Sequence, residues 1–152
     1  MLRHTVATLA YRGGKVLRDA PDNFGDFRAS EKTRTPSQIL AHICDLLDWS
    51  CHQVRGDKNW TEVPPRAWPD DVDRFFDGLR RLDALLAEEK PMGVQPEKLF
   101  QAPIADALTH VGQIAILRRI AGAPIRGENY FVADIVTGRV GKEQSPPRRE
   151  FE

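Results

Sequence analysis

DALTHVGQI, at residues 106–114, lies inside a longer segment, residues 103–121, that has the apolar periodicity of a helix. Asp106 and His110 are four residues apart, so on a helix they lie one turn apart on the same face. Two side chains at this spacing can bind one metal ion, as the two histidines of metalloprotease helices do. The segment therefore predicts half of a metal site.

The apolar side chains of residues 103–121 cover a broad part of the expected helix surface. Most fall on one side, and Ile116 and Ile120 extend the coverage beyond it. A helix that is apolar over so much of its circumference is buried on more than one side. Asp106, His110 and Gln113 form a narrow stripe beside the apolar arc, so we expect these polar groups to face inward or into a cleft.

A second helix is predicted over residues 36–55. Thr35 suits the N-cap, proline suits the first helical position, and Gln38 can complete a capping box. His42 falls within the apolar arc of this helix, so its imidazole is expected to face the interior. We therefore predict that the chain brings His42 together with the pair at positions 106 and 110.

Two further helices complete the expected fold. Apolar residues at helical spacing predict one helix over residues 2–17 and another from Pro69 to about position 89. The Gly13-Gly14 pair weakens the first by about 1 kcal/mol per glycine relative to alanine, and is tolerated where another backbone packs close. No segment shows strand-like alternation or a repeat. Four long helices joined by long loops predict an all-α protein with a four-helix bundle.

The length of 152 residues fits a single domain that buries its own core. We expect the bundle over about residues 1–122 and a C-terminal extension over about 123–152. Within the extension, Tyr130, Phe131 and Ile135 suggest one short helix. The whole chain is thus expected to form one helical-bundle domain.

The charge of the chain argues against two classes of partner. The sequence has 22 basic and 22 acidic residues, so there is no overall field to attract nucleic acid or an anionic membrane. No apolar run approaches the roughly 20 residues that span a bilayer. Arg12 and Lys15 interrupt the only mildly apolar N-terminal segment, so no signal-peptide pattern is present. We expect a cytoplasmic protein.

The two cysteines lie seven residues apart in the second predicted helix, at Cys44 and Cys51. Two helical turns separate them, a distance of about 10 Å, whereas a disulfide needs Cα atoms within about 7 Å. They cannot pair while the helix holds, so we expect two reduced cysteines, as in a reducing compartment.

His42, Asp106 and His110 are suitable ligands for a divalent ion. Imidazole and carboxylate groups bind zinc, nickel, manganese and iron, and three protein ligands leave positions open for water. A buried carboxylate is also costly unless it is paired or bound to metal. The same residues permit a metal-free interpretation, in which His42 binds a backbone carbonyl in the core and the other two form an ordinary helical pair.

Residues around this set have two interpretations each. Gln113 either hydrogen-bonds a ligand or a metal-bound water, or is a boundary amide. Asp45, one turn after His42, either supports that histidine or is a salt-bridged acid. Trp60 and Trp68 are expected to anchor loops rather than to enclose a substrate.

Charged residues near the end of the bundle have separate predicted roles. Arg118 and Arg119 lie in the last turns of the fourth predicted helix, where they are expected to complement its negative end. Glu128 and Tyr130 follow a glycine turn, so they can fold back over the end of the bundle. In that position, core packing is the expected role of Tyr130, and lining of the site is the alternative.

Two short stretches resemble the DinB-like family of four-helix-bundle metalloenzymes. They are TPSQILAH at residues 35–42, followed by Trp49, and DALTHVGQI at residues 106–114, continuing through LRR at 117–119. The likeness extends in helix order over nearly the whole chain. It implies a DinB-like bundle with a metal site between the second helix and the last one.

The resemblance also assigns ligands. It implies that the second helix supplies one histidine, here His42, and that the last helix supplies a His-x-x-x-His pair, of which His110 matches the second half. Asp106 stands where the family often has the first histidine. A carboxylate can also ligate, but it is harder and anionic, which shifts the preference toward metals that tolerate oxygen ligands.

The family resemblance implies a metal-dependent enzyme, either hydrolase-like or a transferase that uses a low-molecular-weight thiol. A bound ion would lower the pKa of a water molecule or bind a thiolate. The reaction stays open, because the only candidates for a general base are Asp45 and Glu128. The alternatives are a non-catalytic bundle that binds a metal or small ligand and acts as a homodimer, since the last helix is broadly apolar, and a vestigial site without metal.

Overall fold

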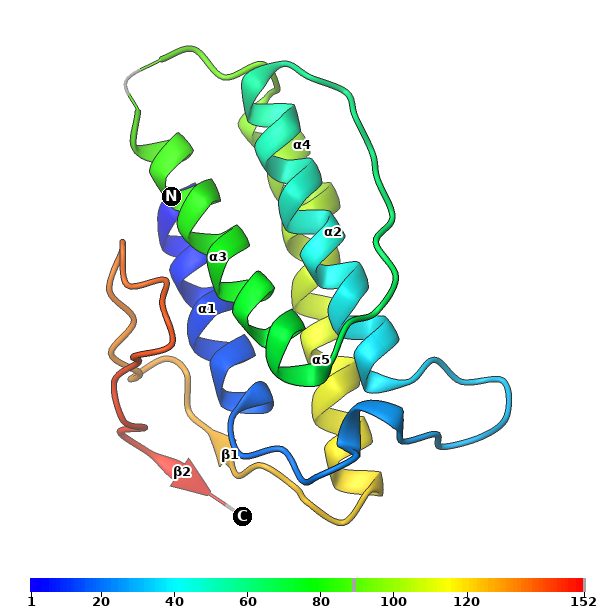
Figure 1. The fold of residues 1–152 in the computed structure, drawn as a ribbon. Coiled ribbons are helices and arrows are strands. Elements are labelled where there is room, and N and C mark those ends of the chain that lie inside the picture. Colours follow the sequence, from blue (N-terminus) through cyan, green and yellow to red (C-terminus); the bar gives the residue numbers. More distant parts are fainter. Residues whose placement is uncertain (89, 152) are drawn as a thin grey trace.

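The computed structural model describes residues 1–88 and 90–151, most of which form a bundle of four long helical segments (Figure 1). Three of the segments are single helices: α1 at Leu2–Leu17, α2 at Pro36–Arg55 and α3 at Trp68–Ala87. The fourth has three consecutive pieces: α4 at Pro96–Leu99, a π-helical turn at Phe100–Ile104 and α5 at Ala105–Ile120. A 3-10 turn at Phe24–Asp26 lies between α1 and α2. The predicted all-α four-helix fold is confirmed.

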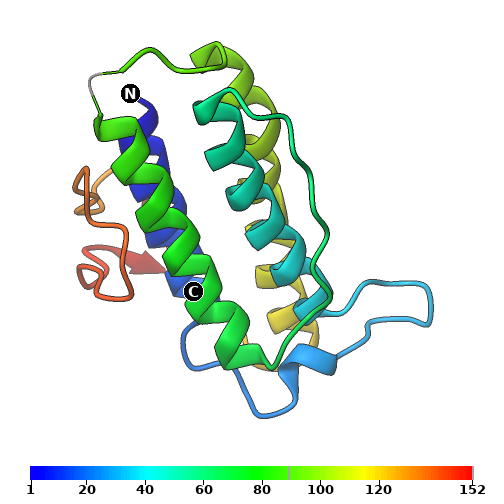
Figure 2. The ribbon, with the colours of Figure 1, turned by 45° about the horizontal axis from the view of Figure 1, so that its top comes forward.

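The connection between α2 and α3, residues 56–67, runs along the side of the bundle. α2 packs against α3 and α5, and α1 packs against the same two helices. α2 and α3 run in the same direction, whereas α5 runs in the opposite direction (Figures 1 and 2). The connection must therefore run back along the whole length of α2, which is about 30 Å. Its twelve residues can span about 40 Å when extended, so the connection is long enough.

The interior of the bundle is apolar and draws on all four segments. Burial of each large aliphatic or aromatic side chain contributes about 1.5–3 kcal/mol. The largest fully buried side chains include Leu9, Leu40, Ile43, Leu47, Phe75, Leu79, Leu82, Leu99 and Ile114. Within the described residues, no helix is long and apolar enough to cross a membrane.

Gly13 gives room to a side chain rather than to a backbone, which corrects the expectation of close backbone packing. A Cβ atom at position 13 would overlap the ring of Phe75, which is fully buried. At the neighbouring Gly14, the nearest atom to an added Cβ is Cζ of Phe76, 3.5 Å away, an ordinary contact. A side chain at position 13 would therefore overlap its neighbour, whereas one at position 14 would fit.

Replacing Gly13 with alanine is expected to lower the free energy of unfolding by up to about 2 kcal/mol, because overpacking a core costs about 1–3 kcal/mol and the gain in helix propensity offsets about 1 kcal/mol of that cost. Gly14→Ala is the matched control, which should be neutral or slightly stabilising. Urea denaturation followed by circular dichroism measures both. Equal effects of the two substitutions would contradict this account of Gly13.

The predicted start of the fourth helix at Pro103 is wrong, because helical structure already begins at Pro96. Pro103 has no N–H to donate, and its ring would clash with the carbonyl of residue 99 in an ordinary α-helical turn. The chain widens into a π-helical turn that contains this proline, and α5 continues from it. The third helix begins one residue earlier than predicted, at Trp68, and its predicted end at position 89 lies outside the described residues.

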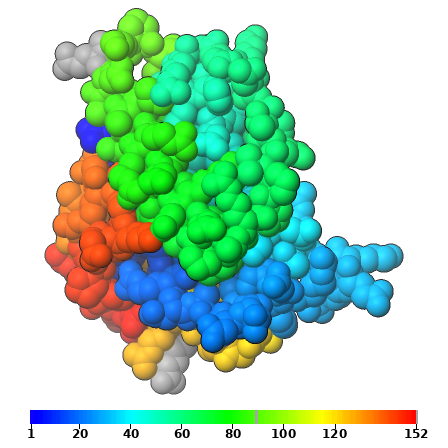
Figure 3. All heavy atoms as spheres, viewed as in Figure 1, coloured from blue at the N-terminus to red at the C-terminus, as the bar shows by residue number. Residues whose placement is uncertain are grey.

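The short helix predicted near Tyr130 is absent from the described part of the C-terminal extension. Instead, β1 at Gly127–Glu128 pairs antiparallel with β2 at Glu150–Phe151. Tertiary contacts fix this conformation: the buried Glu128 accepts hydrogen bonds from Tyr11 Oη at 2.6 Å and Lys15 Nζ at 2.7 Å. The extension thus folds back as predicted, but against α1. Figure 3 shows the extension, in orange and red, on the left of the molecule.

Arg118 complements the end of a different helix from the one that was predicted. Its guanidinium donates to the carbonyl oxygens of Val16, Arg18 and Asp19 at the C-terminal end of α1. It also donates to the carbonyl of Ala123, just after its own helix. Arg118 therefore joins the ends of α1 and α5.

Both cysteines are free, as predicted, and both are buried. Burial raises the pKa of the Cys44 and Cys51 thiols, so the reactive thiolate is disfavoured at neutral pH. They contribute to the core as small apolar side chains.

Candidate metal site

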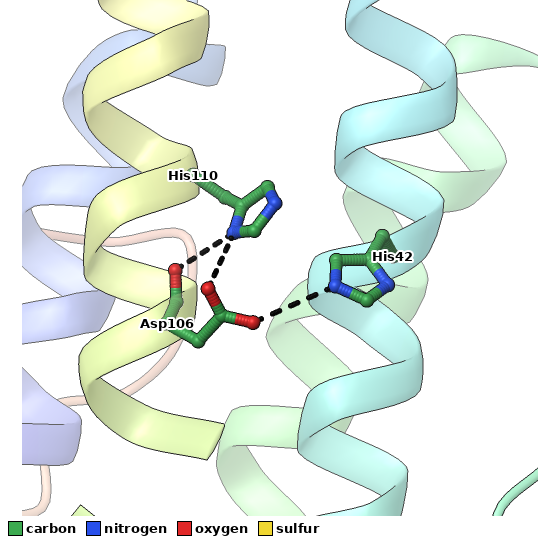
Figure 4. A group of neighbouring side chains, drawn as sticks. All are labelled: His42, Asp106 and His110. Carbon is green, nitrogen blue, oxygen red and sulfur yellow. Dashed lines mark hydrogen bonds and ion pairs between the residues drawn. The ribbon is translucent and has the colours of Figure 1, made fainter. Parts of the chain in front are cut away.

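The fold brings His42, Asp106 and His110 together, as the sequence predicts (Figure 4). One ligand atom of each residue can be chosen so that all three lie within 4.8 Å of one another. Asp106 lies between the two imidazoles: its Oδ2 is 3.6 Å from Nε2 of His42, and its Oδ1 is 3.2 Å from Nδ1 of His110. The site is formed by neighbouring faces of α2 and α5.

Local structure on α2 explains the position of His42. Thr35 Oγ1 accepts a hydrogen bond from the Gln38 backbone N–H, and Gln38 Oε1 accepts one from the Thr35 backbone N–H. This is the predicted capping box, and it fixes where α2 begins. His42 lies less than two turns further on, on the side of α2 that faces α5.

The separations suit a small divalent ion. Two ligands of a tetrahedral ion, each about 2.1 Å from it, lie about 3.4 Å apart. Nε2 of His42 and Oδ2 of Asp106, 3.6 Å apart, are close to that spacing. Ligation by His110 through Nε2 would need its ring or the Asp106 side chain to turn, because Nδ1 is the ring nitrogen that faces Asp106 here. Two imidazole nitrogens and one carboxylate oxygen fit zinc, nickel, manganese or iron, with further positions left for a ligand.

His110 is held in one orientation by a backbone contact. Its Nδ1 lies 2.9 Å from the carbonyl oxygen of Asp106, one turn earlier on the same helix. A proton on Nδ1 that is donated to this oxygen leaves the lone pair on Nε2. Metal-binding histidines are commonly oriented by such a hydrogen bond. The His110 side chain is also buried, so its ring is confined.

Asp106 lies at the rim of the site rather than in the interior. Its side chain is 44% exposed, so the cost of burying a charge does not explain why it faces the histidines. The same contacts would also fit a metal-free arrangement in which the Asp106 carboxylate lies between the two imidazoles as an ion-pair partner. The two arrangements differ in one measurable property, the affinity of the protein for a divalent ion.

Trp60 is a neighbour of the site that the sequence did not reveal. Its ring packs edge-on against His42, with 6.0 Å between centroids, and against Trp49, with 5.8 Å between centroids. It was expected only to anchor a loop. α2 and α3 run in the same direction, so the connection between them must pass beside α2, and this places Trp60 next to His42. No local pattern in the sequence predicts the relative direction of the two helices. Trp68 behaves as predicted, because it packs on Phe24 away from the histidines.

Asp45 and Gln113 have different surroundings. Asp45 is buried, with Oδ1 2.6 Å from Arg74 on α3, and its Oδ2 accepts a hydrogen bond from the backbone N–H of Val63. It therefore holds both α3 and the connection against α2. Gln113 is exposed on α5, one turn after His110. Their suggested support of a metal stays a prediction.

A second carboxylate continues the ion-pair network of Asp45. Asp48 accepts hydrogen bonds from Arg74 and Arg81. Burial alone would raise the pKa of Asp48, but these two guanidinium groups hold that pKa below its ordinary value. Asp48 therefore stays ionised at neutral pH.

A cavity of about 390 Å³ adjoins the site on the side of His42. It lies between the N-terminal half of α2 and the connection. Its lining includes Arg34, Gln38 and His42 on one side and Glu62 and Pro64 on the other. A small molecule bound in this cavity would touch His42, one of the three candidate ligands.

Comparisons of the chain with protein-family models, curated proteins and solved structures found no match. Within the described part of the chain, His42, Asp106 and His110 are a group in a helical bundle that could hold a metal ion.

Proposed function

We propose that this protein is a metal-dependent enzyme that holds one divalent ion with His42, Asp106 and His110. The observation that carries the proposal is the meeting of three donor groups from two helices, all within 4.8 Å. The resemblance to the DinB-like family supports it, because that family takes ligands from the same two helices. We further propose that the chain is a DinB-like protein in which aspartate replaces one histidine.

The ion-pair pattern leaves neither Asp45 nor Glu128 free as a general base, so either reaction, thiol-dependent transfer or hydrolysis, would depend on the ion itself. When bound, such an ion lowers the pKa of a coordinated water or thiol. Hydrolysis would also benefit from a free general base. Asp45 is engaged by Arg74, and Glu128 is engaged by Tyr11 and Lys15 on α1. A divalent ion would ionise a coordinated thiol as well as a coordinated water, and either would then need no such base.

A non-catalytic homodimer is the second candidate, favoured by two exposed side chains on α5. Ile116 and Ile120 are 58% and 57% exposed, one turn apart on the same face. A second copy of the chain would remove this apolar surface from water. Light scattering that reports a monomer at all concentrations would contradict the dimer, whatever the metal content.

The metal proposal is tested by elemental analysis together with tryptophan fluorescence. Purified protein incubated with zinc, nickel or manganese and then dialysed should retain close to one ion per chain. Cobalt or nickel bound beside Trp60 and Trp49 should quench their emission. The quenching should be smaller in Trp60→Phe but kept in the matched control Trp68→Phe, whose indole packs elsewhere. Protein that stays metal-free with all three ions would refute the proposal.

A further inference from the structure

The cavity beside His42 contains two opposite charges that the fold leaves unused. Arg34 and Glu62 both line it, Arg34 just before α2 and Glu62 from the connection. Neither side chain makes an ion pair within residues 1–88 and 90–151, although most other charged groups near α2 do. Both residues are exposed, so an unpaired cation and an unpaired anion line one open hollow of the surface.

The other polar groups of the cavity add no further unpaired charge. Asp45 also lines it, but its charge is balanced by Arg74 at 2.6 Å. Gln38 uses its side-chain oxygen in the capping box, which leaves its amide NH₂ free to donate. The α2 side of the cavity therefore offers a cation and amide donors, and the opposite side offers one carboxylate.

We propose that this cavity binds a small zwitterion, a ligand that carries both a carboxylate and an ammonium group. The carboxylate meets Arg34 and the Gln38 amide, as guanidinium and amide donors suit carboxylate oxygens. The ammonium meets Glu62. A third group of the same ligand reaches past His42 to the ion, so this inference rests on the proposed metal-dependent function.

The size of the cavity is consistent with such a ligand. Its volume of about 390 Å³ lies at the lower end of the roughly 300–1,000 Å³ typical of small-molecule sites. A polyanion such as a nucleotide would need several free cations, but the lining supplies only one unpaired cation, Arg34, among the described residues. The balance of one positive and one negative group selects for a ligand of net charge near zero at this end.

The test uses four small thiols that share a sulfur atom for the metal and differ in which charged groups they carry. They are cysteine, with both charges; 3-mercaptopropionate, with the carboxylate; cysteamine, with the ammonium; and 2-mercaptoethanol, with neither. Each is titrated anaerobically into the cobalt-loaded protein, and the thiolate-to-cobalt absorption reports binding. Affinities of one thiol are compared between protein variants, so the intrinsic strength of each chelate cancels.

Arg34→Gln is expected to weaken cysteine and 3-mercaptopropionate about tenfold, and to leave cysteamine and 2-mercaptoethanol unchanged. Glu62→Gln should weaken cysteine and cysteamine by a similar factor and spare the other two. Arg55→Gln is the matched control, because Arg55 is exposed at the opposite end of α2. It should change none of the four affinities.

Three outcomes would overturn the inference. One is that Arg34→Gln and Glu62→Gln change all four affinities alike, and another is that they change none. The third is cobalt that binds but never takes up a thiol. In each of these cases the cobalt spectrum without thiol remains, so the metal proposal survives. Wild-type protein that shows no cobalt spectrum would instead refute the metal proposal, and this inference with it.

Discussion

Replacing His110 with alanine is expected to lower the affinity of the protein for a divalent ion by more than about 100-fold. Loss of a residue that merely supports a ligand costs about 10–100-fold, and His110 is proposed to be a ligand itself. Only His42 and Asp106 would then hold the ion, and two ligands leave it open to competing water and chelators. Competition with a chromophoric chelator measures the affinity, and elemental analysis after dialysis measures the retained metal.

The matched control is His52→Ala on the other end of α2. His52 is partly exposed and contacts Asp57, with 2.7 Å between Nδ1 and Oδ2, outside the candidate site. This substitution should leave the metal content unchanged. Full retention of metal by His110→Ala would show that ions bind elsewhere, and would leave the three residues as a metal-free group of ion-pair contacts.

Replacing Arg118 with methionine is expected to lower the free energy of unfolding by about 3 kcal/mol. Arg118 is 6% exposed, and its guanidinium donates four hydrogen bonds, all to backbone carbonyl oxygens. Each bond from a charged donor contributes about 1.5–3 kcal/mol, part of which water would restore. Burial lowers the pKa of Arg118, but at neutral pH the guanidinium stays charged.

Arg119→Met is the matched control for this prediction. Arg119 is the next residue along the same helix, but its side chain is exposed. Surface substitutions of this kind change stability by no more than about 0.5 kcal/mol. Urea denaturation of the two variants beside the wild type measures the difference. Equal stability of the two variants would mean that the hydrogen bonds of Arg118 do not hold the ends of α1 and α5 together.

Local sequence patterns determined the helices and half of the site. Thr35 and Gln38 form the capping box because its partners are three residues apart, so no distant contact is needed. Asp106 and His110 share a face because the helix repeat places them there. The position of His42 in the apolar arc of α2 predicted that it faces the bundle. These features depend on residues within a few turns of one another.

The remaining features depend on contacts between distant parts of the chain. Pro103 alone favours a helix start, but the segment before it is already helical and buries Leu99 in the core, so Pro103 lies inside a π-helical turn. The side chain of Glu128 is fixed in one orientation because Tyr11 and Lys15, which are distant in sequence, donate hydrogen bonds to its carboxylate. Such contacts cannot be read from spacing, because each requires the fold to bring together residues that are far apart in sequence.

The sequence by itself determined that the chain forms four helices and that Asp106 and His110 lie on one helix face. Only the tertiary structure decided that His42 meets them, that Trp60 lies beside His42, and that Arg34 and Glu62 share a cavity. The physical reason is the distance along the sequence over which each interaction acts. Hydrogen bonding and apolar periodicity act within a helix, whereas the direction of α3 relative to α2, which positions the connection, is fixed by burial of the entire core.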